Sequence, residues 1–143
     1  MTVERILSEK GRAVVTIEPD HTLAEAARLL TEKRIGAVVV TDKSHPVIGI
    51  LSERDIVRGI ASHGAKILEE PVSHCMTTKV VTCVGHTGVI DILELMTEGK
   101  FRHVPVVEDH QLVGIVSIGD IVKYRLAQAE AETRAMRDYI ATA

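Results

Sequence analysis

The first helix that the hydrophobic pattern predicts follows Thr22. Apolar residues recur there at the i, i+3, i+4, i+7 spacing that places them on one helix face. Thr22 and Glu25 have the spacing of a capping box, whose side chains accept two backbone N–H groups that a helix start leaves unpaired. We therefore expect a helix to begin at Thr22. Its apolar stripe consists of Leu23, Ala26, Ala27 and Leu30.

Short runs of almost wholly apolar residues flank this helix. Val14–Ile17 has the pattern of a short strand, and Ala37–Thr41 and Val47–Leu51 have that of a hairpin closed by a polar turn. Because the runs are apolar on both faces, helices must cover the sheet on at least one side. A second helix is expected from about Asp55.

The whole pattern then occurs a second time, and such repeats organise a fold. Val15–Arg58 aligns with Val81–Lys123, with an offset of 66 residues before Ser44 and 65 after it. His103–Val107 and Leu112–Val116 correspond to the hairpin. Each copy thus predicts the order β-α-β-β-α. The stripe of the second copy consists of Val89, Ile92, Leu93 and Met96, and its second helix begins near Asp120.

The repeat predicts an α+β fold in which two copies pack around a pseudo-two-fold axis, because one copy alone would leave apolar faces bare. A shorter match, 3–7 with 72–76, precedes the copies. We expect a first repeat at 1–64, a linker at 65–71, a second repeat at 72–127 and a helical extension at 128–143. The helix-favouring composition from Ile121 to about Tyr139 indicates an exposed helix that could self-associate.

Both copies contain Gly-Ile-hydrophobic-Ser-x-x-Asp, with the motif ending at Ser52/Asp55 and Ser117/Asp120. The structural interpretation is a capping box at a helix start. The functional interpretation is a carboxylate, which is acceptor-only, binding the two hydroxyls of a ribose. The two are compatible, because a helix N-terminus also favours phosphate.

The order and duplication of these motifs resemble the cystathionine-β-synthase (CBS) domain family. Over about residues 2–127 the chain is similar to a stand-alone tandem pair, or Bateman module. The other motifs that carry the resemblance are Val-x-x-Ile-Leu/Val-x-x-Cys-Met, the Val-Thr strand and Arg-His-Val-Pro-Val-Val at 102–107. The resemblance implies a regulatory ligand (AMP, ADP, ATP or NAD(H)) and no catalytic cofactor.

The resemblance also implies two nucleotide sites between the repeats, each with one Asp for the ribose. The first would consist of Asp120, Ser117, Ile115, Thr16, Gly36 and Ala37. The second would consist of Asp55, Ser52, Ile50, Thr82, Val104 and Pro105. The phosphate candidates are Arg102, His103 and Arg54. Because copy 1 has Gly36-Ala37 where copy 2 has Arg102-His103, we expect the sites to differ in affinity or ligand.

Composition narrows the choice of partners. Of 143 residues, 45% are hydrophobic and only three are aromatic: Phe101, Tyr124 and Tyr139. Single-strand nucleic-acid binders stack bases on aromatic side chains, and a net charge of −3 does not suit a phosphate backbone. Nucleic acid is therefore a disfavoured partner, whereas a free base could lie between aliphatic side chains.

The remaining signals predict a cytoplasmic protein without a membrane segment. The first twelve residues lack a signal-peptide core, and the longest apolar runs fall far short of the roughly 18 residues that span a bilayer. Cys75 and Cys83 have no CxxC spacing and fit a reduced chain. Both are expected to be core residues rather than nucleophiles. The histidines show no zinc-site spacing.

Three functions remain open. The leading hypothesis is a non-catalytic nucleotide sensor that acts in trans on an unknown target protein, as a homodimer. The second is a structural or interaction dimer with degenerate nucleotide sites. The third is an enzyme related to IMP dehydrogenases, which contain such pairs. The third is disfavoured because a catalytic barrel needs about 250 residues.

Overall fold

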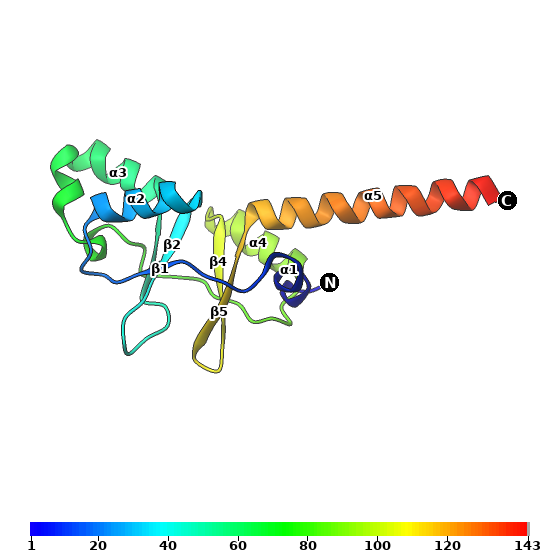
Figure 1. Cartoon of the computed structure of the whole chain (residues 1–143), viewed down its shortest axis with the longest axis horizontal. Helices are drawn as coiled ribbons and strands as arrows, with labels where there is room; N and C mark the ends of the chain where they lie inside the picture. Colours follow the sequence, from blue (N-terminus) through cyan, green and yellow to red (C-terminus); the bar gives the residue numbers. More distant parts are fainter. Residues whose placement is uncertain (143) are drawn as a thin grey trace.

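The computed structural model describes residues 1–142 (Figure 1). The helices are α1 (Val3–Lys10), α2 (Leu23–Lys33), α3 (Glu53–His63), α4 (Val89–Gly99) and α5 (Ile118–Thr142). The strands are β1 (Thr16–Ile17), β2 (Ala37–Val40), β3 (Gly49–Ser52), β4 (His103–Glu108) and β5 (Gln111–Ser117). Two 3₁₀ turns, η1 (Ala65–Glu69) and η2 (Val72–His74), connect the repeats.

Each repeat contributes its own small sheet. In the first, β1 pairs with β2 in parallel and β2 pairs with β3 antiparallel. In the second, β4 and β5 form an antiparallel hairpin. The predicted first strand of copy 2 is not formed as a strand, since it is reduced to a parallel bridge between Cys83 and Val106. The order β-α-β-β-α is therefore complete in copy 1 and shortened in copy 2.

The predicted helix starts are found, with one difference. The Thr22 hydroxyl accepts the Glu25 N–H at 3.1 Å, as a cap should. The difference is at Glu25, whose carboxylate contacts the His21 ring, at 2.5 Å, and accepts the Thr22 hydroxyl, at 3.3 Å. At the start of α3 both halves of the box form, between Ser52 and Asp55.

The two hydrophobic cores exchange their leading segments. Helix α1, which precedes copy 1, packs with α4, β4, β5 and α5 of copy 2. The segment of η1 and η2, which precedes copy 2, packs with the core of copy 1 through Ile67 and Val72. Tight glycines accept both segments: a Cβ on Gly114 would lie 2.7 Å from Cδ2 of Leu7, and one on Gly49 would lie 2.6 Å from Sδ of Met76. This exchange ties the repeats into one body.

Helix α5 is 25 residues long and leaves that body as a rod (Figure 1). Its first turns pack on the copy 2 core through Ile118, Ile121 and Tyr124. Every residue from Ala129 to Thr142 is exposed. The extended helix thus agrees with the prediction, although it begins at Ile118. None of the helices in residues 1–142 has the length and apolarity needed to cross a membrane.

Candidate functional site: a carboxylate at the start of helix α5

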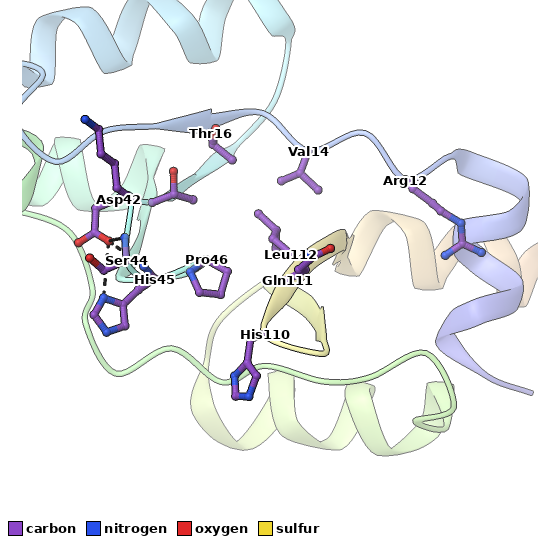
Figure 2. A pocket seen from close by; sticks show the side chains of 12 residues that line it. Arg12, Val14, Thr16, Asp42, Ser44, His45, Pro46, His110, Gln111 and Leu112 are labelled. Atoms are coloured by element: carbon purple, nitrogen blue, oxygen red, sulfur yellow. Dashed lines mark hydrogen bonds and ion pairs between the residues drawn. The ribbon is translucent and has the colours of Figure 1, made fainter.

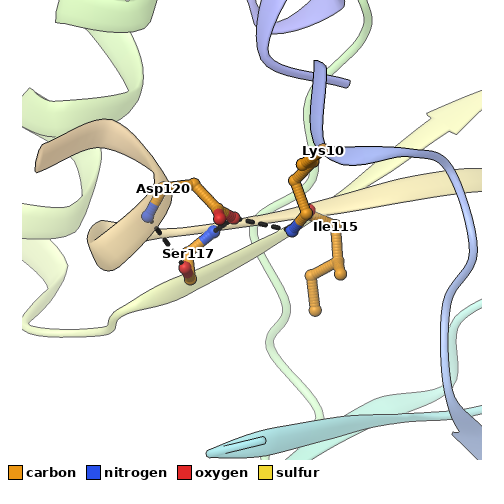
Figure 3. Close-up of polar contacts among 4 residues, drawn as sticks. All are labelled: Lys10, Ile115, Ser117 and Asp120. Carbon is orange, nitrogen blue, oxygen red and sulfur yellow. Dashed lines mark hydrogen bonds and ion pairs between the residues drawn. The ribbon is translucent and has the colours of Figure 1, made fainter. Parts of the chain in front are cut away.

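Asp120 lies in the first turn of α5, directly after β5 (Figure 3). Its Oδ2 accepts the Ser117 N–H at 2.8 Å, and its own N–H donates to the Ser117 hydroxyl at 3.1 Å. The capping-box geometry therefore exists here as it does at Asp55. It fixes the carboxylate at a helix N-terminus, beside the strand that carries Ile115, so the structural and functional interpretations coexist.

Lys10, at the end of α1, completes this cluster, and sequence reasoning did not identify it. Its Nζ donates to Oδ2 of Asp120 at 2.6 Å and to the Ile115 carbonyl oxygen at 2.8 Å. Both side chains are partly shielded from water, with 32% and 21% of their surface exposed. A signal was present in the sequence: extending the match of 3–7 with 72–76 by three residues aligns Lys10 with Lys79.

The ion pair controls the charge of the site. Partial burial raises the pKa of Asp120, but the hydrogen bonds from Lys10 and Ser117 outweigh it, so the pKa lies below its ordinary value. Asp120 is therefore ionised at neutral pH. The hydrogen bonds found within residues 1–142 end on Oδ2, which leaves Oδ1 for a hydroxyl of a ligand.

His103 and Gly36 bring the two repeats together near this carboxylate. A Cβ on Gly36 would lie 3.5 Å from Cε1 of His103 and 3.0 Å from Oε1 of Glu53. Burial lowers the pKa of His103, while the Asp120 carboxylate opposes that shift. The imidazole is thus neutral at pH 7. The predicted residues Asp120, Ser117, Ile115, His103 and Gly36 form one neighbourhood, with Lys10 and Glu53 added.

The Asp55 site has a different environment. Its Oδ2 accepts the Ser52 N–H at 2.9 Å and the Ser52 hydroxyl at 3.1 Å, and the nearest cation, Arg58 Nη1, lies 3.9 Å from Oδ1. The backbone of Thr77 pairs with both the N–H and the carbonyl of Ile50, at 3.0 and 2.9 Å. At the Asp55 site, the strand backbone to which a base could hydrogen-bond is therefore already paired with another backbone segment. At the Asp120 site, the Ile115 carbonyl oxygen instead accepts a hydrogen bond from the Lys10 side chain.

Thr16 lies in β1, in register with Val39 of β2, which in turn pairs with Ile50 of β3. It lines an open hollow of about 510 Å³ between the crossing segment 12–16 and the tips of the two hairpins (Figure 2). Asp42 shapes one wall of the hollow, since its carboxylate accepts the N–H groups of Ser44 and His45, both at 2.8 Å. No other predicted site residue lines this hollow.

The remaining predicted residues are scattered around the two sites. The Arg102 side chain, directly before β4, lines a hollow on α5 with Val122 and Leu126. Ala37 and Val104 are buried strand residues, and Val104 belongs to the copy 2 core. Pro105 pairs with Ile115 in the β4–β5 ladder. Thr82 and Arg54 are exposed.

The cysteines are core residues. Cys75 and Cys83 are free thiols, and Cys83 is buried. Burial raises the pKa of Cys83 to about 11, so the thiol is protonated and unreactive at neutral pH. Within residues 1–142, no cluster of three or more His, Cys, Asp or Glu side chains is arranged to hold a metal ion.

Comparisons with known proteins agree with this architecture. The sequence matches the CBS domain family twice, over residues 4–62 and 72–127. The CBS-domain-containing protein ATU1752 from Agrobacterium tumefaciens has a crystal structure with a TM-score of 0.84 and 49% identity, over 87% of this chain and 92% of that one. The mitochondrial protein CBSX3 of Arabidopsis thaliana is 30% identical over 97% of this chain and 71% of its own length.

The chain therefore belongs to the CBS-domain family and carries a tandem pair of these domains. A more distant solved relative shows what such a pair can hold. The CBS domain pair of protein MJ0100 was solved in complex with 5′-methylthioadenosine and S-adenosyl-L-methionine. It has a TM-score of 0.80 and 25% identity to this chain, over 90% of this chain and 98% of that one.

Proposed function

We propose that this CBS pair is a non-catalytic sensor that binds an adenine nucleotide at Asp120. The observation that carries the proposal is an ionised carboxylate fixed at the N-terminus of α5 with Oδ1 left for a ligand. Both hydroxyls of a ribose can donate to it, and each charged hydrogen bond contributes about 1.5–3 kcal/mol. The adenosine-containing ligands of the MJ0100 pair support the same ligand class.

The Asp120 site suits a nucleotide with phosphates better than the Asp55 site does. Lys10 and the helix N-terminus supply positive charge beside Asp120, and both favour phosphate. At Asp55, the Ile50 backbone is already paired with Thr77, and the nearest cation, on the exposed Arg58 side chain, lies 3.9 Å away. We therefore assign the principal site to Asp120 and a weaker one to Asp55.

The signal would leave through α5. Asp120 lies in the first turn of the rod, so a ligand that displaces Lys10 changes the contacts that hold α5 to α1. A ligand shifts an equilibrium between two states only if it binds one of them more tightly. Here the two states differ in whether the ion pair between Lys10 and Asp120 is formed or broken. A target protein that reads the position of α5 would then respond in trans.

Self-association belongs to the same proposal. Four large apolar residues are exposed on the helices of the body: Val57 and Ile60 on α3, and Ile90 and Leu95 on α4. A helix face that exposes large apolar side chains can pack against a partner. We propose a second copy of this chain as that partner. Light scattering at several concentrations tests the homodimer directly.

A second candidate function is a structural dimer whose nucleotide sites have degenerated. The observation that favours it is that both sites are already partly satisfied internally, by Lys10 at Asp120 and by Thr77 at Ile50. Under this alternative, no nucleotide changes the melting temperature, because only a ligand that binds the folded state stabilises it.

Isothermal titration calorimetry with the full chain separates the two. Adenosine, AMP, ADP, ATP, NAD, NADH and S-adenosyl-L-methionine are titrated, with CMP as the control. We expect Asp120→Ala to abolish the tighter binding and leave only the weaker site, and Asp55→Ala to retain the tighter binding, with circular dichroism confirming that both variants fold. The absence of binding by the wild type at millimolar ligand would contradict the proposal. A turnover assay with IMP and NAD tests the enzymatic alternative, and we expect none.

A further inference from the structure

One face of α5 carries a seam of mostly apolar residues with a heptad spacing. The steps between successive members are four, three, four, three and four residues, which are the a and d positions of a coiled coil. The seam consists of Val122, Leu126, Ala129, Thr133, Met136 and Ile140. Its four large members expose between 51% and 67% of their surface.

Charges flank the seam in complementary order. With Leu126 at an a position, Arg125 and Glu132 occupy g positions, and Glu130 and Arg137 occupy e positions. In a parallel pair, each g residue faces the e residue five positions further along the partner helix. Arg125 then meets the partner's Glu130, and Glu132 meets the partner's Arg137. Two-fold symmetry doubles these to four pairs of opposite charge.

The exposed part of α5 has few contacts that would stabilise it as an isolated helix. Residues from Ala129 to Thr142 are exposed throughout, and an isolated helix shorter than about 12–15 residues is marginal in water. The seam continues into the body, where Val122 and Leu126 line the hollow at the base of α5 with Ile118 and Arg102. A helix packed along the seam would cover that hollow as well.

We propose that the α5 helices of two copies pair in parallel and in register along this seam, forming a short two-stranded coiled coil. This inference rests on the self-association proposed above and adds a second contact surface, on α5, with its direction and its register. In such a pair, each seam residue packs against the same residue of the partner helix. The small side chains of Ala129 and Thr133 form the central contacts. The bodies then lie at the same end of the coil, where the Asp120 sites sit at the base of each rod.

Cysteine cross-linking tests direction and register together. All chains carry Cys75→Ser, and the buried Cys83 thiol stays protonated at neutral pH. We expect Ala129→Cys, on the seam, to give a covalent dimer on mild oxidation, and Ala131→Cys, on the outer face, to stay monomeric on denaturing gels. Equal cross-linking of the two variants, or none, would overturn the proposal. So would cross-linking of Ala129→Cys only when mixed with Thr133→Cys, since that result shows an antiparallel pair.

A charge-swap experiment tests the flanking pairs. One variant carries Arg125→Glu and Arg137→Glu, and the other carries Glu130→Lys and Glu132→Lys. Each alone should dimerise at least about tenfold more weakly than the wild type, and an equimolar mixture should recover the wild-type affinity. The control, Arg134→Glu with Asp138→Lys, changes charges off the seam and should have no effect. Unchanged dimerisation of both swapped variants would refute the pairing.

Failure of this inference can be told from failure of the proposed function. A dimer that persists while Ala129→Cys does not cross-link shows that the copies associate through the body and not through α5. Calorimetry with AMP on the same samples reports the nucleotide site independently, because Asp120 lies outside the heptad seam.

Discussion

The Lys10 ammonium lies 2.6 Å from the Asp120 carboxylate, and this contact joins the N-terminal helix to the start of the C-terminal one. The two residues are 110 positions apart in the chain. The same ammonium binds the Ile115 carbonyl oxygen, so one side chain holds the strand end and the helix start together. Ligand binding at Asp120 must therefore either keep or break a contact that also contributes to stability.

The contribution of this ion pair can be measured against the matched site. Asp120→Ala and Asp55→Ala each remove the carboxylate half of a capping box, which costs about 1 kcal/mol. Asp120→Ala also removes the partner of the half-buried Lys10, so we expect its free energy of unfolding to fall by about 1 kcal/mol more. In a Lys10→Met background the two variants should become equal. Urea denaturation gives the values, and a difference that survives in that background would show that Lys10 is not its cause.

The exchange of leading segments predicts an unusual pattern of rescue. Gly114→Ala places a methyl group 2.7 Å from Cδ2 of Leu7, and overpacking of this kind costs about 1–3 kcal/mol. Leu7→Ala alone leaves a cavity that costs about 2–5 kcal/mol. The double variant should lose less than the sum, because the methyl group occupies part of the vacated space. Additive losses in thermal unfolding would mean that Leu7 does not pack on Gly114 in solution.

Much of this fold could be predicted from the sequence, because local patterns and the repeat agree. The stripe after Thr22, the hairpins and the long C-terminal helix follow from periodicity and composition. The exchange of α1 and η2 between the cores could not be predicted, since it depends on which glycine each segment meets. The same is true of Lys10, whose partner lies in the other repeat, and of Arg102, whose side chain lines a hollow at the base of α5.

The contact between the repeats at Gly36 should control nucleotide binding. Its copy 2 counterpart is Arg102, and a larger side chain at Gly36 would push against His103 and Glu53. We expect Gly36→Leu to weaken AMP binding by about tenfold, which corresponds to about 1.4 kcal/mol. Gly36→Ala is the control and should bind nearly as the wild type does, because its methyl group is in ordinary contact with His103 and its only tight neighbour is the end of the flexible Glu53 side chain, which can shift. Equal affinities for the wild type and Gly36→Leu would place the nucleotide elsewhere.

His103 should make the protein less stable in mild acid. Burial holds its pKa below the ordinary value, although Asp120 and Glu53 raise it and Lys10 and Arg102 lower it further. As pH falls below about 6.5, the unfolded chain takes up a proton at this residue while the folded chain does not, so stability is lost down to the folded pKa. The His103→Gln variant lacks this proton uptake.

Melting temperatures measured from about pH 7.5 to about pH 5.5 test this expectation. The advantage of the wild type over His103→Gln should shrink as pH falls, by up to a few degrees. His21 has the opposite sign, because its hydrogen bond to Glu25 raises its pKa and adds stability in acid. That effect is common to both proteins and cancels in the difference. A difference that stays constant or grows in acid would show that the imidazole is not held neutral between the repeats.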